Sequence, residues 1–144
     1  VLDMHTGLGQ YGYGEPISHM PQGSEARERV MRLWGESVTE PARGNSVSTI
    51  RRGLSAFGWR ERVGAHCVFV TFEFGTFAID QVIDALRGDC WARRSGLDWN
   101  DPVQARIRAA SRRAFYPDTD TWRELVLART RQCIRQAIDG AALS

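Results

Sequence analysis

The strongest constraint on the fold is an apolar run at residues 68–76 that carries one carboxylate. This run (VFVTFEFGT) is rich in β-branched and aromatic side chains and predicts a strand buried on both faces. Glu73 lies inside it. An unpaired charge in such a strand costs on the order of several kcal/mol or is titrated to its neutral form. We therefore interpret Glu73 as a catalytic base, a metal ligand or one half of a buried ion pair with an arginine.

A second strand-like run, residues 1–5 (VLDMH), ends at His5 and opens a predicted glycine-rich turn at 6–14. Polar residues at the carboxyl ends of hydrophobic strands are where open α/β sheets place their chemistry. Asp3 and His5 share one face of this strand. If the two strands are parallel neighbours, the imidazole of His5 and the carboxylate of Glu73 should lie within about 8 Å of each other. The alternative for His5 is a hydrogen-bonded histidine that only ends its strand.

Composition favours one domain over residues 1–144 and excludes several function classes. Nineteen arginines and no lysine are offset by seventeen carboxylates, and a net charge of +2 predicts no nucleic-acid partner. No stretch approaches the roughly 18 apolar residues of a membrane span. The glycine-rich turn lacks the Gly-Lys-Ser/Thr ending of a phosphate loop, and no Gly-x-Ser-x-Gly word of a serine hydrolase is present.

The three cysteines, Cys67, Cys90 and Cys133, are widely spaced and form no Cys-x-x-Cys pair. This spacing excludes a zinc knuckle and predicts buried free thiols in a reducing compartment, which indicates a cytoplasmic protein.

The apolar periodicity predicts four helices, over residues 24–34, 77–90, 101–114 and 119–140. Residues 36–64 are the least regular stretch: a loop, with a possible short strand at 47–54 leading into a helical turn. His19 and His66 are interpreted as incidental, the first in a loop and the second at the start of the Glu73 strand, which we expect over residues 66–74. Two strands are too few for a natural sheet, so the chain is expected to be part of a larger α/β domain whose other strands precede it.

Four short sequence motifs resemble those of a known superfamily. Residues 3–9 (DMHTGLG) resemble the Asp-x-His strand end of zinc carboxypeptidase-like hydrolases, and residues 71–76 (TFEFGT) resemble their catalytic-glutamate strand. The likeness is closest to an uncharacterised metallopeptidase-like family, which residues 114–117 (AFYP) and 121–123 (TWR) also resemble. The chain is similar as well to the aspartoacylase and succinylglutamate desuccinylase branch.

This resemblance implies the carboxyl-terminal part of a three-layer α/β/α domain with a mixed sheet. It implies that His5 is the third zinc ligand and that Glu73 is the general base. The family's first two ligands belong to an upstream His-x-x-Glu word, which this chain lacks. We therefore expect zinc in the intact protein, no tightly bound zinc and no activity in residues 1–144 alone, and a possible homo-oligomer.

The implied reaction is hydrolysis of a peptide or an N-acyl amino acid. Arg51 and Arg52 are the nearest candidates to bind a substrate carboxylate, although solvent-facing charges are the simpler interpretation of both. Tyr11 and Tyr13 are candidates to line the mouth of the site. The rival hypothesis is a non-catalytic binding or scaffold domain that keeps the fold without the metal.

Overall fold

The structure, a computed structural model, describes residues 1–142. It is an α/β protein built on a three-stranded mixed sheet in the order β1-β3-β2. The elements in chain order are β1 (Leu2–Tyr11), β2 (Gly14–Ile17), α1 (Glu25–Trp34), α2 (Ser55–Val63), β3 (Val70–Gly75), α3 (Ile79–Arg94), α4 (Pro102–Phe115) and α5 (Asp120–Ala142). Two 3-10 turns, η1 (Gly35–Ser37) and η2 (Pro41–Arg43), lie between α1 and α2.

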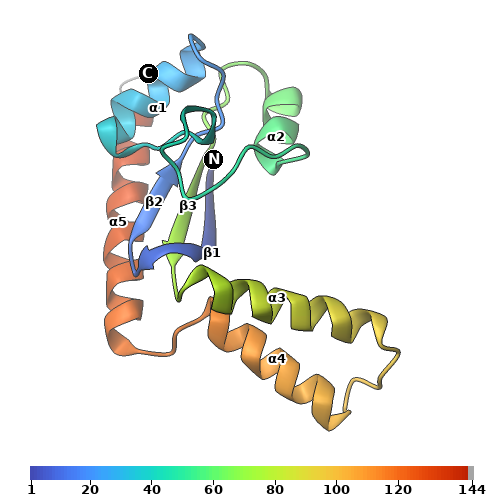
Figure 1. Cartoon of the computed structure of the whole chain (residues 1–144). Helices are drawn as coiled ribbons and strands as arrows, with labels where there is room; N and C mark the ends of the chain where they lie inside the picture. The colour runs from blue at the N-terminus through green and yellow to red at the C-terminus, as the bar shows by residue number, and fades with distance from the viewer. Residues whose placement is uncertain (143–144) are drawn as a thin grey trace.

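The central strand β3 is parallel to β1 and antiparallel to β2. This arrangement confirms the predicted α/β class and the mixed sheet. It also meets the condition of parallel pairing on which the expected approach of His5 to Glu73 depended. The carboxyl end of β3 points toward α3 and α4, which form a hairpin that projects from that end of the sheet (Figure 1).

One face of the sheet carries the apolar core. Phe72 and Phe74 of β3 are buried in a cluster with residues of α1 and α5. Trp34 packs edge-on against Phe72, with the ring centroids 5.9 Å apart. Burial of one such aromatic side chain contributes about 1.5–3 kcal/mol, so this face supplies much of the stability that holds β3 in place.

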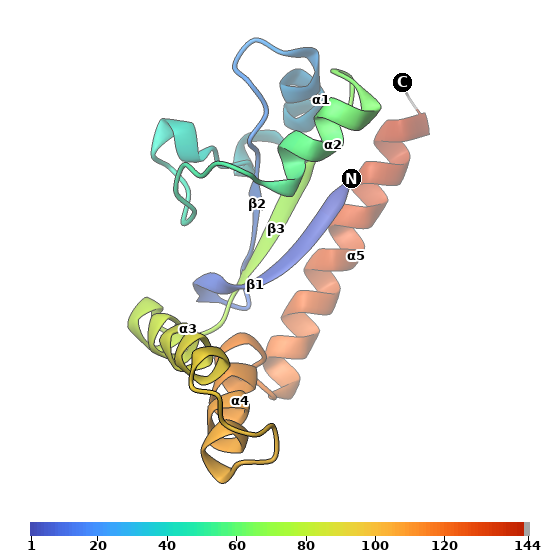
Figure 2. The same ribbon diagram turned by 90° about the vertical axis from the view of Figure 1, so that its right-hand side faces the viewer.

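The opposite face carries the polar residues of the strands. Helix α5 lies on one side of the sheet, and α2 with the segment before it lies on the other (Figure 2). A cavity on the second side is lined by Thr71 and Glu73 of β3 and by residues of that segment. The two faces of β3 therefore separate the core from the polar site.

The predicted helix boundaries are largely confirmed. Ser24 caps α1 through a hydrogen bond to the Arg27 N–H, and Gly35 ends the helix. Asp101 caps α4 by accepting the Val103 N–H. Within residues 1–142, no helix has both the length and the apolar character needed to cross a bilayer.

Three predictions about strands are wrong. The predicted glycine-rich turn is strand through Tyr11, and the chain turns only at Gly12. A third strand, β2, follows directly; it was missed because glycine and proline in Gly14–Ile17 are poor strand formers. Strand β3 begins at Val70 rather than at residue 66.

Two further predictions fail elsewhere. Residues 47–54 form no strand, and the helical turn expected after them is the full helix α2, whose weak apolar pattern buries only Ala56. Cys90 is exposed, because it lies on the solvent side of α3, whereas Cys67 and Cys133 are buried as expected; all three thiols are free.

Candidate functional site

His5 and Glu73 are direct neighbours across the sheet. They are register partners in the parallel β1–β3 ladder, and His5 Nδ1 lies 3.9 Å from Glu73 Oε2. The two side chains are therefore on the same face of adjacent strands, well within the predicted separation. No arginine lies within ion-pair distance of Glu73 in residues 1–142, so the pairing considered from the sequence is not formed.

The glycine-rich end of β1 supplies a hydrogen bond to Glu73. The ladder is irregular here, since Gly7 and Tyr11 both pair with Gly75. In this bulge the Leu8 N–H donates to Glu73 Oε1 at 3.1 Å. Gly7 has φ of +142°, and a Cβ there would lie 2.9 Å from the Phe115 ring, so glycine is required. The bulge thus fixes one carboxylate oxygen and leaves Oε2 facing His5.

The environment of Glu73 favours its protonated form. Burial raises the pKa of Glu73 above its ordinary value, and the nearby charge of Glu15 acts in the same direction. The Leu8 hydrogen bond and the charges of His5 and Arg51 oppose this shift without cancelling it. A carboxylate with a raised pKa accepts a proton more readily than an exposed glutamate, as a general base requires.

A second carboxylate, that of Asp3, contacts the other ring nitrogen of His5. Its Nε2 lies 3.0 Å from Asp3 Oδ2, which also accepts the Ser55 hydroxyl at 3.2 Å. The His5 side chain is 52% exposed, so its ring is open to a ligand. Metal-binding histidines commonly give their second ring nitrogen to a carboxylate, and Asp3 occupies that place. Sequence reasoning put Asp3 on this face without assigning it a role.

Arg51 and His19 complete the walls of the cavity. Its volume is roughly 90 Å³, and it is lined by Arg51 and His19 together with His5 and Glu73. The pKa of His19 is lowered, first by burial and then by the charge of Arg51, which favours its neutral form. His19 was interpreted as incidental; only the fold brings it beside the strand ends.

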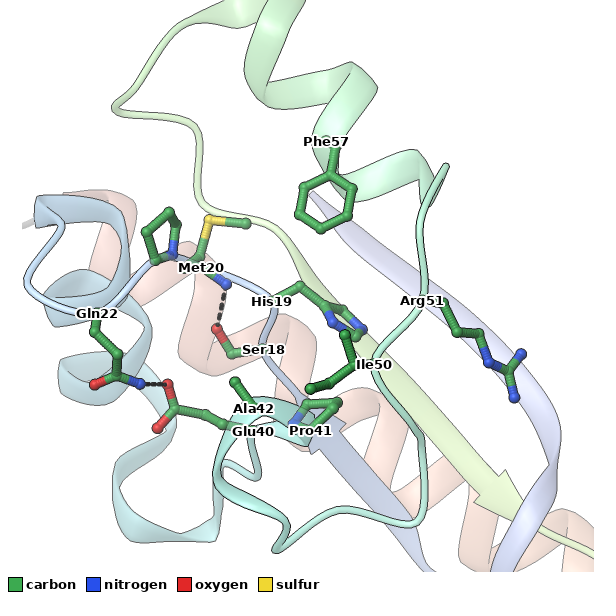
Figure 3. Close-up of a pocket in the computed structure, with 11 residues that line it drawn as sticks. Ser18, His19, Met20, Gln22, Glu40, Pro41, Ala42, Ile50, Arg51 and Phe57 are labelled. Atoms are coloured by element: carbon green, nitrogen blue, oxygen red, sulfur yellow. Dashed lines mark hydrogen bonds between the residues drawn. The ribbon is translucent and has the colours of Figure 1, made fainter.

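A second, more apolar cavity of roughly 170 Å³ adjoins the first. Arg51 and His19 line both, and Figure 3 shows His19 between Phe57 and Ile50. The rings of His19 and Phe57 meet edge-on, with centroids 6.4 Å apart. Glu40 lies at the far end, where it is hydrogen-bonded to Gln22 (Figure 3). We refer to these two cavities, which share His19 and Arg51 in their linings, as the cleft; His5 and Glu73 line its first cavity, and the second is the more apolar.

The remaining predicted site residues lie outside this cleft. Arg52 is exposed and lines neither cavity. The hydroxyl groups of Tyr11 and Thr119 share a hydrogen bond of 2.5 Å. Tyr13 is exposed, just after the turn at Gly12. His66 lies in another cavity of roughly 600 Å³, whose lining contains no carboxylate.

Sequence reasoning also missed Glu15. It is only 4% exposed and pairs in register with Glu73 across β2 and β3. Its signal is an acidic residue directly before Pro16-Ile17, but the flanking glycine and proline conceal the strand.

The described residues fit only part of a catalytic zinc site. Such sites use three protein ligands and one open position. Residues 1–142 contain no group of three His, Cys, Asp or Glu side chains that could hold a metal ion. The exposed imidazole of His5, backed by Asp3, fits one ligand position. Any zinc bound at His5 would need further ligands from outside these residues.

Comparison with known proteins gives a family but no function. A family model described as "Protein of unknown function (DUF2817)" matches residues 1–129. The searches of curated proteins and of solved structures returned no match. The matched region includes β1, β3 and the whole cleft, so the chain belongs to the DUF2817 family.

Proposed function

We propose that this chain carries the general base and one metal ligand of a zinc-dependent hydrolase, of the carboxypeptidase-like or amide-bond deacylase kind. The observation that supports this proposal most directly is that His5 and Glu73 are register partners, with an imidazole nitrogen 3.9 Å from a carboxylate oxygen. The likeness of residues 3–9 and 71–76 to zinc carboxypeptidase-like strand ends supports the same assignment.

In this proposal Glu73 moves the proton. Zinc, when bound, supplies a Lewis acid that polarises a carbonyl and acidifies a water molecule. Leu8 holds Oε1 of Glu73, so Oε2 is free to accept a proton from the attacking water. Glu73 then returns this proton to the leaving amine. Asp3 orients His5 through its Nε2.

The cleft suggests the substrate class. Arg51 forms no ion pair in residues 1–142 and lies where the two cavities meet, so its guanidinium is available to a carboxylate. The apolar chamber beside it, with Phe57 and Ile50, suits an apolar side chain. We infer a peptide or an N-acyl amino acid as substrate.

The test is zinc dependence in the intact protein. Zinc content and turnover are measured on N-acyl amino acids and short peptides, before and after chelation and with zinc restored. We expect turnover to follow zinc, and His5→Ala to lower zinc content and turnover together. A protein that is folded but binds no zinc and cleaves none of these substrates would be the rival binding or scaffold domain.

A further inference from the structure

Glu15 is a buried carboxylate that takes no direct part in the proposed reaction. It lies on β2, on the same face of the sheet as Glu73. No basic side chain lies within ion-pair distance of it in the described part of the chain. A buried charge without a counterion must be stabilised by hydrogen bonds, so its donors indicate what it does.

All the donors to Glu15 come from one segment, residues 39–51, which we name the covering loop. The carboxylate oxygen Oε1 accepts the Thr39 hydroxyl, the Ser46 hydroxyl at 2.8 Å and the Val47 N–H at 3.1 Å. Hydrogen bonds to an ionised acceptor are about twice as strong as neutral ones. One carboxylate oxygen thus joins the start of this loop, at Thr39, to its middle, at Ser46 and Val47.

The covering loop has little regular structure of its own near the cleft. Residues 45–51 belong to no helix or strand, and Ile50 is 76% exposed. Ser46 also holds the next part of the loop, because its Oγ accepts a hydrogen bond from the Ser48 N–H at 3.1 Å. Ser48 and Arg51 then line the cavity that holds Glu73. Arg51 therefore lies in the same loop as the residues that bind Glu15, four residues after Val47.

We propose that Glu15 is a positioning residue that fixes the covering loop over the cleft and so places Arg51 for a substrate carboxylate. The loop attachment stands on the hydrogen bonds alone, whereas the role of Arg51 toward substrate rests on the proposed function. The two parts are tested separately.

The attachment is tested by trypsin cleavage of the native protein after Arg51 and Arg52, with each site identified by mass spectrometry. Glu15→Leu removes the acceptor and should speed cleavage there by about tenfold or more, because local opening becomes easier. Ser46→Ala removes one donor and should have a smaller effect. Val82→Ala, which weakens the buried face of α3, is the control and should leave cleavage in this loop unchanged.

Wild-type cleavage in Glu15→Leu would overturn the proposal. If that variant does not fold, Glu15→Gln combined with Ser46→Ala decides, since the amide keeps one acceptor but lacks the charge. Unchanged cleavage in this double variant would overturn the attachment.

The link to substrate is tested by kinetics on the intact protein. Glu15→Gln should raise KM for carboxylate-bearing substrates more than it lowers kcat. Faster cleavage with an unchanged KM would overturn the role of Glu15 in placing Arg51. A wild-type protein without turnover would instead overturn the proposed function, and the cleavage result would still decide the attachment.

Discussion

Replacing Gly75 by alanine is expected to destabilise the protein strongly, because the end of β3 has no room for a methyl group. A Cβ at this position would lie 2.0 Å from the Gln10 carbonyl oxygen and 2.4 Å from that of Gly9. Both atoms are backbone, so the end of β1 would have to move away from β3. That movement would also disturb the bulge that holds Leu8 against Glu73.

The cost can be worked from the hydrogen bonds at Gly75. Its carbonyl oxygen accepts the Gly12 N–H and the Trp122 indole N–H, each at 2.9 Å, and its own N–H donates to Tyr13 at 3.1 Å. Each such bond contributes roughly 0.5–1.5 kcal/mol net. If all three are lost, we expect Gly75→Ala to lower the free energy of unfolding by about 1.5–4.5 kcal/mol.

Urea unfolding followed by tryptophan fluorescence measures this change, and Gly88→Ala is the matched control. Gly88 lies inside α3, where a Cβ would meet Ile107 at an ordinary 3.6 Å. This control should raise stability by roughly 0.5–1 kcal/mol, because alanine is the better helix former. If the free energy of unfolding of Gly75→Ala lies within about 0.5 kcal/mol of that of wild type, the described close packing of the end of β1 on Gly75 is wrong.

Two further predictions concern the cleft. Hydrogen bonds from Arg27 lower the pKa of the buried Glu40 carboxyl. The stability from this pair should be complete above the ordinary pKa of glutamate and be lost as pH falls through the lower folded-state pKa. Thermal melts across acid pH should show this loss of stability in wild type and much less of it in Glu40→Gln. An equal dependence of the melting temperature on pH in both proteins would contradict the stabilising role of the Arg27–Glu40 pair. In the intact protein, Arg51→Ala should raise KM for carboxylate-bearing substrates by about tenfold, whereas Arg52→Ala should change KM little. Equal effects of the two substitutions on KM would mean that Arg51 is not the residue that binds the substrate carboxylate.

The elements that the sequence predicted well are those with strong local signals. Ser24 and Asp101 are good helix caps, and the apolar run ending near Glu73 has the pattern of a buried strand. Strand β2 was missed because its stability comes from pairing with β3 rather than from its own glycine and proline. Helix α2 was predicted only as a helical turn, because it buries no residue but Ala56 and its apolar pattern is weak.

The candidate site was also predicted only in part. The meeting of His5 and Glu73 followed from two polar strand ends and the assumption of parallel pairing. Glu15 and His19 could not be predicted, because the antiparallel pairing of the missed strand β2 brings Glu15 beside Glu73 and places His19, two residues after β2, in the same cavity as Glu73. These contacts join residues far apart in the sequence, and no local pattern records them.

The most direct test of the central claim is to measure turnover and zinc content of Glu73→Gln in the intact protein. The amide keeps the size and the acceptor for the Leu8 N–H but cannot take a proton. We predict that turnover is lost while zinc content stays near that of wild type. Full turnover in Glu73→Gln would contradict the assignment of Glu73 as the base.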